Sequence, residues 1–453
     1  MSGVTFRIVC VVLMVAGLRA TADGDVLIDW NRVATEVIAA DTPYQNPGMA
    51  SRTLAMVNLA MYDAVNQIAP VHQPFYAHAA APVGVSPEAA AAKAAHQVLS
   101  SIYPGQSALL DPALASSLNL IADGPSKSDG VAYGQSVGAA VVANRQGDGF
   151  DAVVQYVPTG EPGHWEPDPL NPGQEAWGPG WGEMVPFVIA SSSQYMPAPM
   201  PAMTDAQYTQ AFNEVKELGA KVSAVRTPEQ TNIGLFWAYD TGGKGTPMNL
   251  YNQVLRNVAE DQGNNLHANA RLFAMASVAI ADAGIVAWDS KFEYDLWRPI
   301  SGIRRADEDG NPDTEADPTW QPLGAPGGSV PDFTPRFPTY VSGHATFGGA
   351  LFQALTEYYG TDEATFSVTS AELTGPEATR TFTRFSDAMA ENGRSRVYLG
   401  IHWSFDDLVG RSVGADVARA IAASHFQPVP EPATLAWMSL GGLLLARCRP
   451  DPR

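Results

Sequence analysis

An all-α fold is predicted for this chain of 453 residues, and three observations support the prediction. Apolar residues recur every three or four positions in a series of segments, which is the spacing of one helix face. No convincing run of alternating apolar and polar residues indicates a strand. Two long segments, 158–201 and 307–337, are rich in Pro, Gly or Trp and are expected to form ordered loops, the first covering one side of the protein. Such loops tend to be functional covers or entrances, with a variable surface insertion as the alternative.

The helices can be justified in order along the chain. Segment 51–68 is apolar at helical spacing and ends before Pro70. Segment 86–103 begins with Ser86 as a cap and Pro87 at the first helical position, where its missing N–H is not needed. Further helices are expected at 129–144, 204–218, 228–238, 250–261, 266–292, 343–359, 379–393 and 402–423.

Composition restricts the class of protein. With 45% apolar and 16% charged residues, the chain has the composition of a folded protein with a large core. A formal net charge of −20 argues against binding nucleic acid or an anionic membrane through a basic face. Against that background the cluster of Arg298, Arg304 and Arg305 stands out. It predicts a basic pocket for a small anion, with ordinary ion pairing on a helix surface as the alternative.

The N-terminus resembles a secretory signal peptide over residues 1–22. Arg7 supplies the charged start, residues 8–18 the apolar stretch, and Ala20-Thr21-Ala22 a cleavage site. The only cysteines, Cys10 and Cys448, both lie in terminal signal segments. If both segments are removed, the mature protein contains no disulfide and depends on core packing for its stability.

Three short segments in the C-terminal half carry the chemistry. They are Lys291 to Pro299, Ser342-Gly343-His344, and Ser395 to His402. Lysine and arginine side chains neutralise an oxyanion, and a Ser-Gly pair offers a hydroxyl and an unobstructed backbone N–H. The two histidines can divide the work between bonding the central atom and moving protons. Together the segments predict a site for a tetrahedral oxyanion.

The spacing of these residues resembles the signature of the vanadium-dependent haloperoxidases and the type 2 phosphatidic-acid phosphatases. That signature is Lys, six residues, Arg-Pro; then Ser-Gly-His; then Ser-Arg, three residues, Gly, one residue, His. The segment from Phe337 to Ala350 is especially similar to vanadium chloroperoxidases, with Val341 where the family usually has Pro. We expect this departure to alter the turn and not the chemistry. The resemblance extends from about Phe236 to Phe426.

The resemblance implies two packed helical bundles of the vanadium chloroperoxidase type with long Pro/Gly-rich loops. We place an N-terminal helical region at 23–200 and the bundle with the anion site at 201–427. Residues 428–453 resemble a PEP-CTERM sorting signal, because Pro430-Glu431-Pro432 precedes an apolar run and terminal arginines. This implies export to the surface or exopolysaccharide of a Gram-negative bacterium, and processing by an exosortase.

The resemblance also assigns roles to individual residues. His402 is the implied vanadium ligand, and His344 the acid–base residue. The residues implied to hold the vanadate oxygens are Lys291, Arg298, Ser342, Gly343 and Arg396. The resemblance also implies that Lys291 polarises bound peroxide. Asp240 matches a residue that orients the equivalent of Arg396. Trp288 and Phe337 match aromatic residues of the halide pocket, with core packing as the alternative role.

Three functions are compatible with this pattern. The favoured one is a vanadium haloperoxidase that uses hydrogen peroxide to oxidise a halide to hypohalous acid, with a small organic acceptor downstream and vanadate as cofactor. The same pocket in an acid phosphatase would hold phosphate, with His402 forming a phosphohistidine. A non-catalytic protein of the exopolysaccharide matrix is the third. Oligomeric state is left open, a homo-oligomer included.

Two further patterns have simpler alternatives. Gly134 to Gly138 and Gly410 to Gly414 both match the G-x-S-x-G pattern of a nucleophile elbow, but neither follows a predicted strand, so helix packing is favoured. The acidic run from Asp307 to Asp313 is similar to a calcium loop, yet Pro312 stands where an EF-hand needs Gly. We therefore favour a solvated acidic loop there, with calcium as the alternative.

Overall fold

The structure is a computed structural model that describes residues 25–41, 46–76, 79–240, 243–326 and 334–429. The predicted signal peptide, the predicted sorting signal from residue 430 onward and both cysteines lie outside these ranges. Within them the chain forms thirteen α-helices, so the all-α prediction is confirmed. The helices are α1 Val26–Ala40, α2 Pro47–Asn66, α3 Pro87–Ile102, α4 Ser107–Asn119, α5 Pro125–Asn144, α6 Ala206–Leu218, α7 Pro228–Phe236, α8 Thr246–Asp261, α9 Leu266–Tyr294, α10 Pro299–Arg304, α11 Gly343–Tyr359, α12 Phe385–Tyr398 and α13 Ser404–Ser424.

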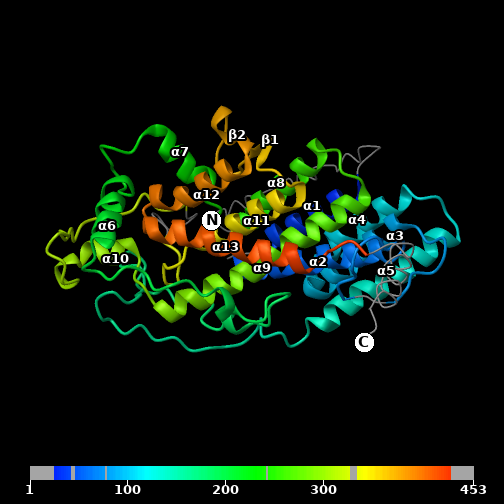
Figure 1. Cartoon of the computed structure of the whole chain (residues 1–453), viewed down its shortest axis with the longest axis horizontal. Helices are drawn as coiled ribbons and strands as arrows, with labels where there is room; N and C mark the ends of the chain where they lie inside the picture. The colour runs from blue at the N-terminus through cyan, green and yellow to red at the C-terminus, as the bar shows by residue number, and fades with distance from the viewer. Residues whose placement is uncertain (1–24, 42–45, 77–78, 241–242, 327–333, 430–453) are drawn as a thin grey trace, which may run out of the picture.

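Helix α9 is the central element of the fold. It contacts α2 on one side and α11 and α13 on another, while α3 packs on both α2 and α5. Figure 1 shows α3 and α5 at one end of an elongated molecule and α6 and α10 at the other. In the described part of the chain α9 alone is long and apolar enough to cross a membrane, but 94% of its most apolar window is buried within the protein. It therefore has the properties of the core helix of a bundle.

The two predicted bundles share one apolar core. A continuous cluster of buried side chains extends from Leu27 in α1 to Phe426 beyond α13. Polar bonds also cross between the regions, since the Asn58 amide donates to Ser277 at 2.7 Å and the Asn31 amide donates to Asn252 at 2.7 Å. The boundary near residue 201 remains a prediction.

Several helices begin where their caps predict. Ser86 accepts a hydrogen bond from the Ala89 N–H at 3.1 Å, and Pro87 takes the first position of α3. Helix α2 begins at Pro47, four residues before the predicted start at Ser51, because Asn46 caps it in the same way. Helices α1, α4 and α10 were not predicted. Helix α10 has six residues and α4 is interrupted by Pro112, so their apolar periodicity is weak, whereas α1 is an amphipathic helix of fifteen residues that was overlooked.

One prediction was wrong at residues 379–393. Instead of a single helix, β2 (Thr379–Arg384) pairs antiparallel with β1 (Glu363–Thr369), and α12 starts only at Phe385. Alternating threonines in β2 face solvent, while Phe382 faces inward and stacks on Phe366 with ring centroids 5.6 Å apart. Cross-strand aromatic and Thr pairs of this kind stabilise a hairpin on a helical surface.

The two G-x-S-x-G patterns are helix-packing sites, as favoured from sequence. A Cβ at Gly134 in α5 would lie 2.1 Å from the Ala90 carbonyl oxygen of α3. A Cβ at Gly414 in α13 would lie 2.0 Å from the Thr346 carbonyl oxygen of α11. Both glycines therefore allow two helix backbones to approach closely, and neither pattern forms a strand-to-helix turn.

The first Pro/Gly/Trp-rich loop covers one long side of the molecule, as expected. In Figure 1 it runs between the end that holds α5 and the end that holds α6. Its regular structure consists of two 3₁₀ turns, at Trp181–Glu183 and Ser192–Tyr195. It is attached to α9 through Asp282, whose carboxylate accepts hydrogen bonds from the N–H groups of Phe187, Val188 and Ile189 at 2.6, 2.8 and 3.1 Å. The loop is thus part of the packed structure.

Candidate active site

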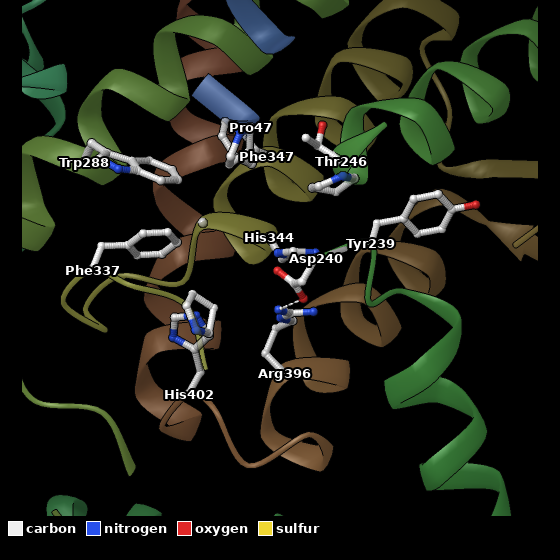
Figure 2. Close-up of a pocket in the computed structure, with 13 residues that line it drawn as sticks. Pro47, Tyr239, Asp240, Thr246, Trp288, Phe337, His344, Phe347, Arg396 and His402 are labelled. Carbon is white, nitrogen blue, oxygen red and sulfur yellow. Dashed lines mark hydrogen bonds and ion pairs between the residues drawn. The ribbon is translucent and has the colours of Figure 1, made fainter. Parts of the chain in front are cut away.

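A pocket of about 420 Å³ lies where helices from both halves of the chain meet. The N-terminal ends of α2, α8 and α11 border it through Pro47, Thr246 and Gly343. Helix N-termini carry partial positive charge, so three of them at one pocket favour an anion. Figure 2 shows His344, Asp240 and Arg396 grouped on one side and His402, Phe337 and Trp288 on the other.

His402 lies in the turn between α12 and α13 and is held by a buried carboxylate. Its Nδ1 is 2.9 Å from Oδ2 of Asp406, one helical turn further along the chain. The Thr339 hydroxyl lies 2.9 Å from the same nitrogen and also donates to Asp406. Because the carboxylate accepts a proton from Nδ1, Nε2 is left as the nitrogen with the lone pair. Burial lowers the pKa of His402, which keeps the ring neutral.

Asp406 was not among the predicted site residues. Its Oδ2 also accepts the N–H of Trp403 at 3.0 Å, and the side chain is fully buried. Burial raises the pKa of Asp406, while the hydrogen bond from Thr339 and the charge of Lys291 oppose that shift. The i,i+4 spacing of His402 and Asp406 at the start of a helix was the sequence signal that could have identified it.

Arg298 and Lys291 lie behind the pocket wall. Arg298 donates from Nη1 to the Ile401 carbonyl at 2.8 Å, and the same atom is 3.1 Å from Nε2 of His402. Its Nε donates to the Phe337 carbonyl at 2.9 Å. The fully buried Lys291 ammonium donates to the carbonyls of Pro338 and Thr339 at 3.2 and 3.0 Å, and to that of Val341. Burial beside Arg298 lowers the pKa of Lys291.

Of the predicted arginine cluster, only Arg298 belongs to the site. Arg305 forms ion pairs with Glu166 and Glu308 at 3.0 and 2.6 Å. Arg304 donates to the carbonyl of Trp320 at 2.8 Å. Surface pairing is therefore the correct interpretation for these two residues.

Arg396 approaches the pocket from α12 and is paired with Asp240. Its Nη2 lies 2.5 Å from Oδ2 of Asp240, and its Nη1 donates to the Ala238 carbonyl at 3.3 Å. Its buried Nε has no hydrogen-bond partner among the residues that the structure describes. A buried N–H donor of this kind has a strong requirement for an acceptor, which a bound oxyanion would satisfy.

His344 and Ser342 stand at the start of α11. Nε2 of His344 donates to the carbonyl of Ala238 at 2.9 Å, and burial together with Arg396 lowers the pKa of His344. Ser342 also caps the helix, by accepting the N–H of Ala345 at 3.4 Å. A Cβ at Gly343 would lie 3.3 Å from the indole of Trp288, which shows how closely the backbone approaches this ring.

Trp288 and Phe337 form an apolar wall of the pocket. Their ring centroids are 5.0 Å apart, and both side chains are buried. The Lys291 ammonium lies 5.1 Å and the Arg298 guanidinium 4.9 Å from the centroid of Phe337. The wall therefore has an apolar surface with cations beside it. Such a surface suits a soft, weakly hydrated anion.

The predicted site residues are brought together by the fold, although not all of them face the pocket. The pocket lining includes Asp240, Trp288, Phe337, Gly343, His344, Arg396 and His402. Lys291, Arg298 and Ser342 lie one layer behind it. Three cations lie at or behind the pocket with two carboxylates, Asp240 and Asp406. The Arg396 Nε donor lacks an acceptor among the described residues, and His402 presents a lone pair at Nε2. These features fit vanadate, an oxyanion bound through one nitrogen.

The acidic run at 307–313 is a compact turn. Asp309 accepts the Asn311 N–H at 2.7 Å and the Thr314 hydroxyl at 2.8 Å, and Asn311 accepts the Asp313 N–H at 2.9 Å. The side-chain oxygens of Asp309 and Asn311, two of the groups that suggested a calcium loop, therefore have hydrogen-bond partners within the turn. Across the described ranges, no group of three or more His, Cys, Asp or Glu side chains is arranged to hold a metal ion.

The fold and the site define a class: a helical-bundle enzyme with a buried, cation-lined oxyanion pocket and two histidines. Residues 271–430 match the family described as the second helical-bundle domain of vanadium chloroperoxidase. Over 491 aligned positions the chain is 31% identical to vanadium chloroperoxidase from Curvularia inaequalis, covering 85% of this chain and 80% of that protein. The chain belongs to the vanadium chloroperoxidase family.

Solved structures agree with this assignment. The crystal structure of a bacterial vanadium-dependent iodoperoxidase is similar with a TM-score of 0.74 and 25% identity, covering 89% of this chain and 96% of that one. A bacterial vanadium-dependent chloroperoxidase in its holo form shares the fold with a TM-score of 0.69 and 17% identity, covering 90% and 100%. The protein is a vanadium-dependent haloperoxidase with vanadate as cofactor and with hydrogen peroxide and halide as substrates.

Proposed function

We propose that this protein is an exported haloperoxidase in which His402 bonds vanadium through Nε2 and the halide reacts against the wall of Trp288 and Phe337. The overall reaction consumes hydrogen peroxide, a halide and one proton and releases hypohalous acid and water. The observation that carries the proposal is the His402–Asp406 pair, which presents an unprotonated Nε2 within reach of Arg298 at 3.1 Å.

The charged residues divide the work of holding the cofactor. Arg396 would donate to vanadate oxygens from its buried Nε, with Asp240 fixing its orientation. Arg298 and Lys291 would add positive charge from behind the wall, and Ser342 and Gly343 would present a hydroxyl and an N–H. Bound vanadate supplies Lewis-acid activation of hydrogen peroxide without a change of oxidation state.

His344 is suited to move the proton. Its Nε2 hydrogen is held by the Ala238 carbonyl, so the other ring nitrogen is the one that accepts a proton. Because burial and Arg396 lower the pKa of His344, the ring is neutral and ready to accept the proton of hydrogen peroxide. A bound anion would offset the charge of Arg396 and favour the protonated ring, which then returns the proton to the departing water.

The aromatic wall bears on the choice of halide. A dry, apolar surface removes water from a halide, and the more strongly hydrated ions gain most in reactivity from that loss. We therefore expect bromide and chloride to be oxidised as well as iodide. Export rests on the predicted signal peptide and sorting signal, and the cell fraction and mature N-terminus of the native protein test it. An organic acceptor and exosortase processing complete the proposal.

Titration of the vanadate-free protein with orthovanadate is the decisive experiment. Binding is followed by calorimetry and halogenation of a dye by absorbance, each with and without excess phosphate. We expect halogenation to rise with vanadate occupancy and phosphate to compete. H402A should lose vanadate binding and halogenation, whereas H425A, remote from the pocket, should retain both. Hydrolysis of a phosphoester without halogenation at full vanadate occupancy would instead identify a phosphatase.

A further inference from the structure

The pocket wall of Trp288 and Phe337 has a third aromatic member, which comes from the first loop. The Trp177 ring makes an edge-to-face contact with Trp288 at 5.2 Å and with Phe337 at 6.3 Å. Since Trp288 and Phe337 are themselves 5.0 Å apart, the three rings form one contiguous cluster. Two of the rings face the anion pocket, and Trp177 supports them from outside.

Hydrogen bonds from Trp177 and Gln174 to main-chain carbonyls hold Trp177 in this position. Its N–H donates to the carbonyl of Arg336 at 2.8 Å, the residue directly before Phe337. Three residues earlier, the Gln174 amide donates to the carbonyl of Thr334 at 3.0 Å. The first loop therefore lies along the segment that carries Phe337, so the positions of Trp177 and Phe337 are coupled.

The contact leaves no room for water on the outer side of Trp288. Gly178 has φ +81°, and a Cβ there would lie 2.7 Å from Cδ1 and Nε1 of the Trp288 indole. The Gly178 backbone therefore lies directly against this edge of the indole, and the close packing leaves no space there for a water molecule.

The opposite side of Trp177 borders a surface groove. That groove is lined by Asn46, Phe150, Val154, Trp177 and Trp181, and its volume is about 580 Å³. It is open to solvent, and the neighbouring Val153 is 86% exposed. The ring of Trp177 thus lies between the solvent in this groove and the pocket wall of Trp288 and Phe337.

From this arrangement we infer that Trp177 is a specificity-determining residue for the halide, acting through Trp288 and Phe337. The inference rests on the proposed placement of the halide at this wall. Loss of the Trp177 ring lets water reach the back of Trp288 and loosens Phe337. A hydrated halide is a weaker nucleophile, and the effect grows in the order iodide, bromide, chloride because hydration strengthens in that order.

The test compares W177A and W177F with wild type and with W320F. Trp320 lies in the second loop, donates to the Lys216 carbonyl at 3.0 Å and does not touch the wall, so it is a matched control. The measurements are kcat/KM for iodide and bromide, the Kd for vanadate and the quenching of tryptophan fluorescence by iodide. We expect W177A to lower the bromide-to-iodide ratio of kcat/KM by about 10-fold and to increase quenching, with vanadate affinity unchanged. W177F and W320F should stay near wild type.

A folded W177A that binds vanadate normally and keeps the wild-type ratio and quenching would overturn the inference. If W177A fails to fold, W177L takes its place, since it retains bulk without the aromatic ring. F337A is measured in parallel. A changed ratio in F337A with an unchanged ratio in W177A rejects the role of Trp177 alone. An unchanged ratio in both variants rejects the placement of the halide at this wall, and with it the inference.

Discussion

Oδ2 of Asp406 lies 2.9 Å from Nδ1 of His402, and both side chains are buried. The carboxylate therefore sets the tautomer of the histidine and leaves Nε2 available to bond a metal. Carboxylates in this position commonly support metal-binding histidines from the opposite side of the ring. The same Oδ2 accepts the Thr339 hydroxyl and the Trp403 N–H, so the orientation of His402 depends on three elements of the chain.

Substitution of Asp406 should weaken the cofactor site without removing any residue that contacts vanadate. For D406N we expect the Kd for vanadate to rise by about 10- to 100-fold, because Nδ1 loses its charged acceptor. Calorimetric titration of the vanadate-free protein measures this. D407N is the control, since Asp407 is equally buried but pairs with Arg411 at 2.6 Å. Equal vanadate affinities for the two variants would contradict the role of Asp406.

The Asp240–Arg396 pair should matter for stability as well as for anion binding. In D240A the Arg396 guanidinium, whose side chain is 1% exposed, would remain buried without its partner. Breaking a buried pair in this way typically costs about 3–5 kcal/mol. Urea unfolding measures the loss, and saturating vanadate should restore part of it because the anion pairs with Arg396. D416A, whose ion pair with Arg419 is half exposed, should change stability by less than about 1 kcal/mol.

The titration of Asp282 makes the free energy of unfolding depend on pH. Burial raises its pKa from 3.8 to about 6, although three backbone N–H groups of the first loop favour the charged form. The folded state therefore binds this proton more tightly than the unfolded state. The stabilisation that this bound proton gives the folded state is fully present below pH 3.8 and is lost as the pH rises through 6.

D282N removes this titration and isolates its effect. The stability of wild type relative to D282N should fall by about 2 kcal/mol between pH 3.8 and pH 6. Urea unfolding of both proteins at several pH values measures the difference. A difference that rises with pH over this range would show that the hydrogen bonds, and not burial, dominate the pKa of Asp282.

The C-terminal end of the described chain is anchored by Phe426. Its ring lies 5.1 Å from Tyr62 and 5.6 Å from Phe75, its carbonyl accepts from Arg271 at 2.9 Å, and it is 1% exposed. F426A should lower the free energy of unfolding by about 3–5 kcal/mol. Removal of residues 430–453 should leave the melting temperature within about 2 °C of the full chain. A large drop on that truncation would show that the body of the protein extends beyond Val429.

The sequence predicts most of the helices because their signals are local. The Ser-Pro start of α3 follows from cap chemistry within four residues, whereas the Asn-Pro start of α2 carries the same signal and was overlooked. The hairpin at 363–384 was missed because its stability comes from Phe366 and Phe382, which meet only after the strands have paired. The spacing predicts Lys291 as a site residue, and the structure buries it one layer behind the pocket lining, where its donation to three carbonyls of the 338–341 segment had no counterpart in the spacing.

Residue chemistry and spacing therefore account for which side chains are predicted to bind the oxyanion. Lysine, arginine, serine-glycine and histidine in this order suit that chemistry in any fold that brings them together. Tertiary packing alone decides how these side chains are held. Arg396 donates to the carbonyl of Ala238, which is 158 positions away in the sequence. Trp177 contacts Trp288 from a loop that has no helical period. Such contacts depend on how distant elements pack, and the pattern of neighbouring residues carries no record of that packing.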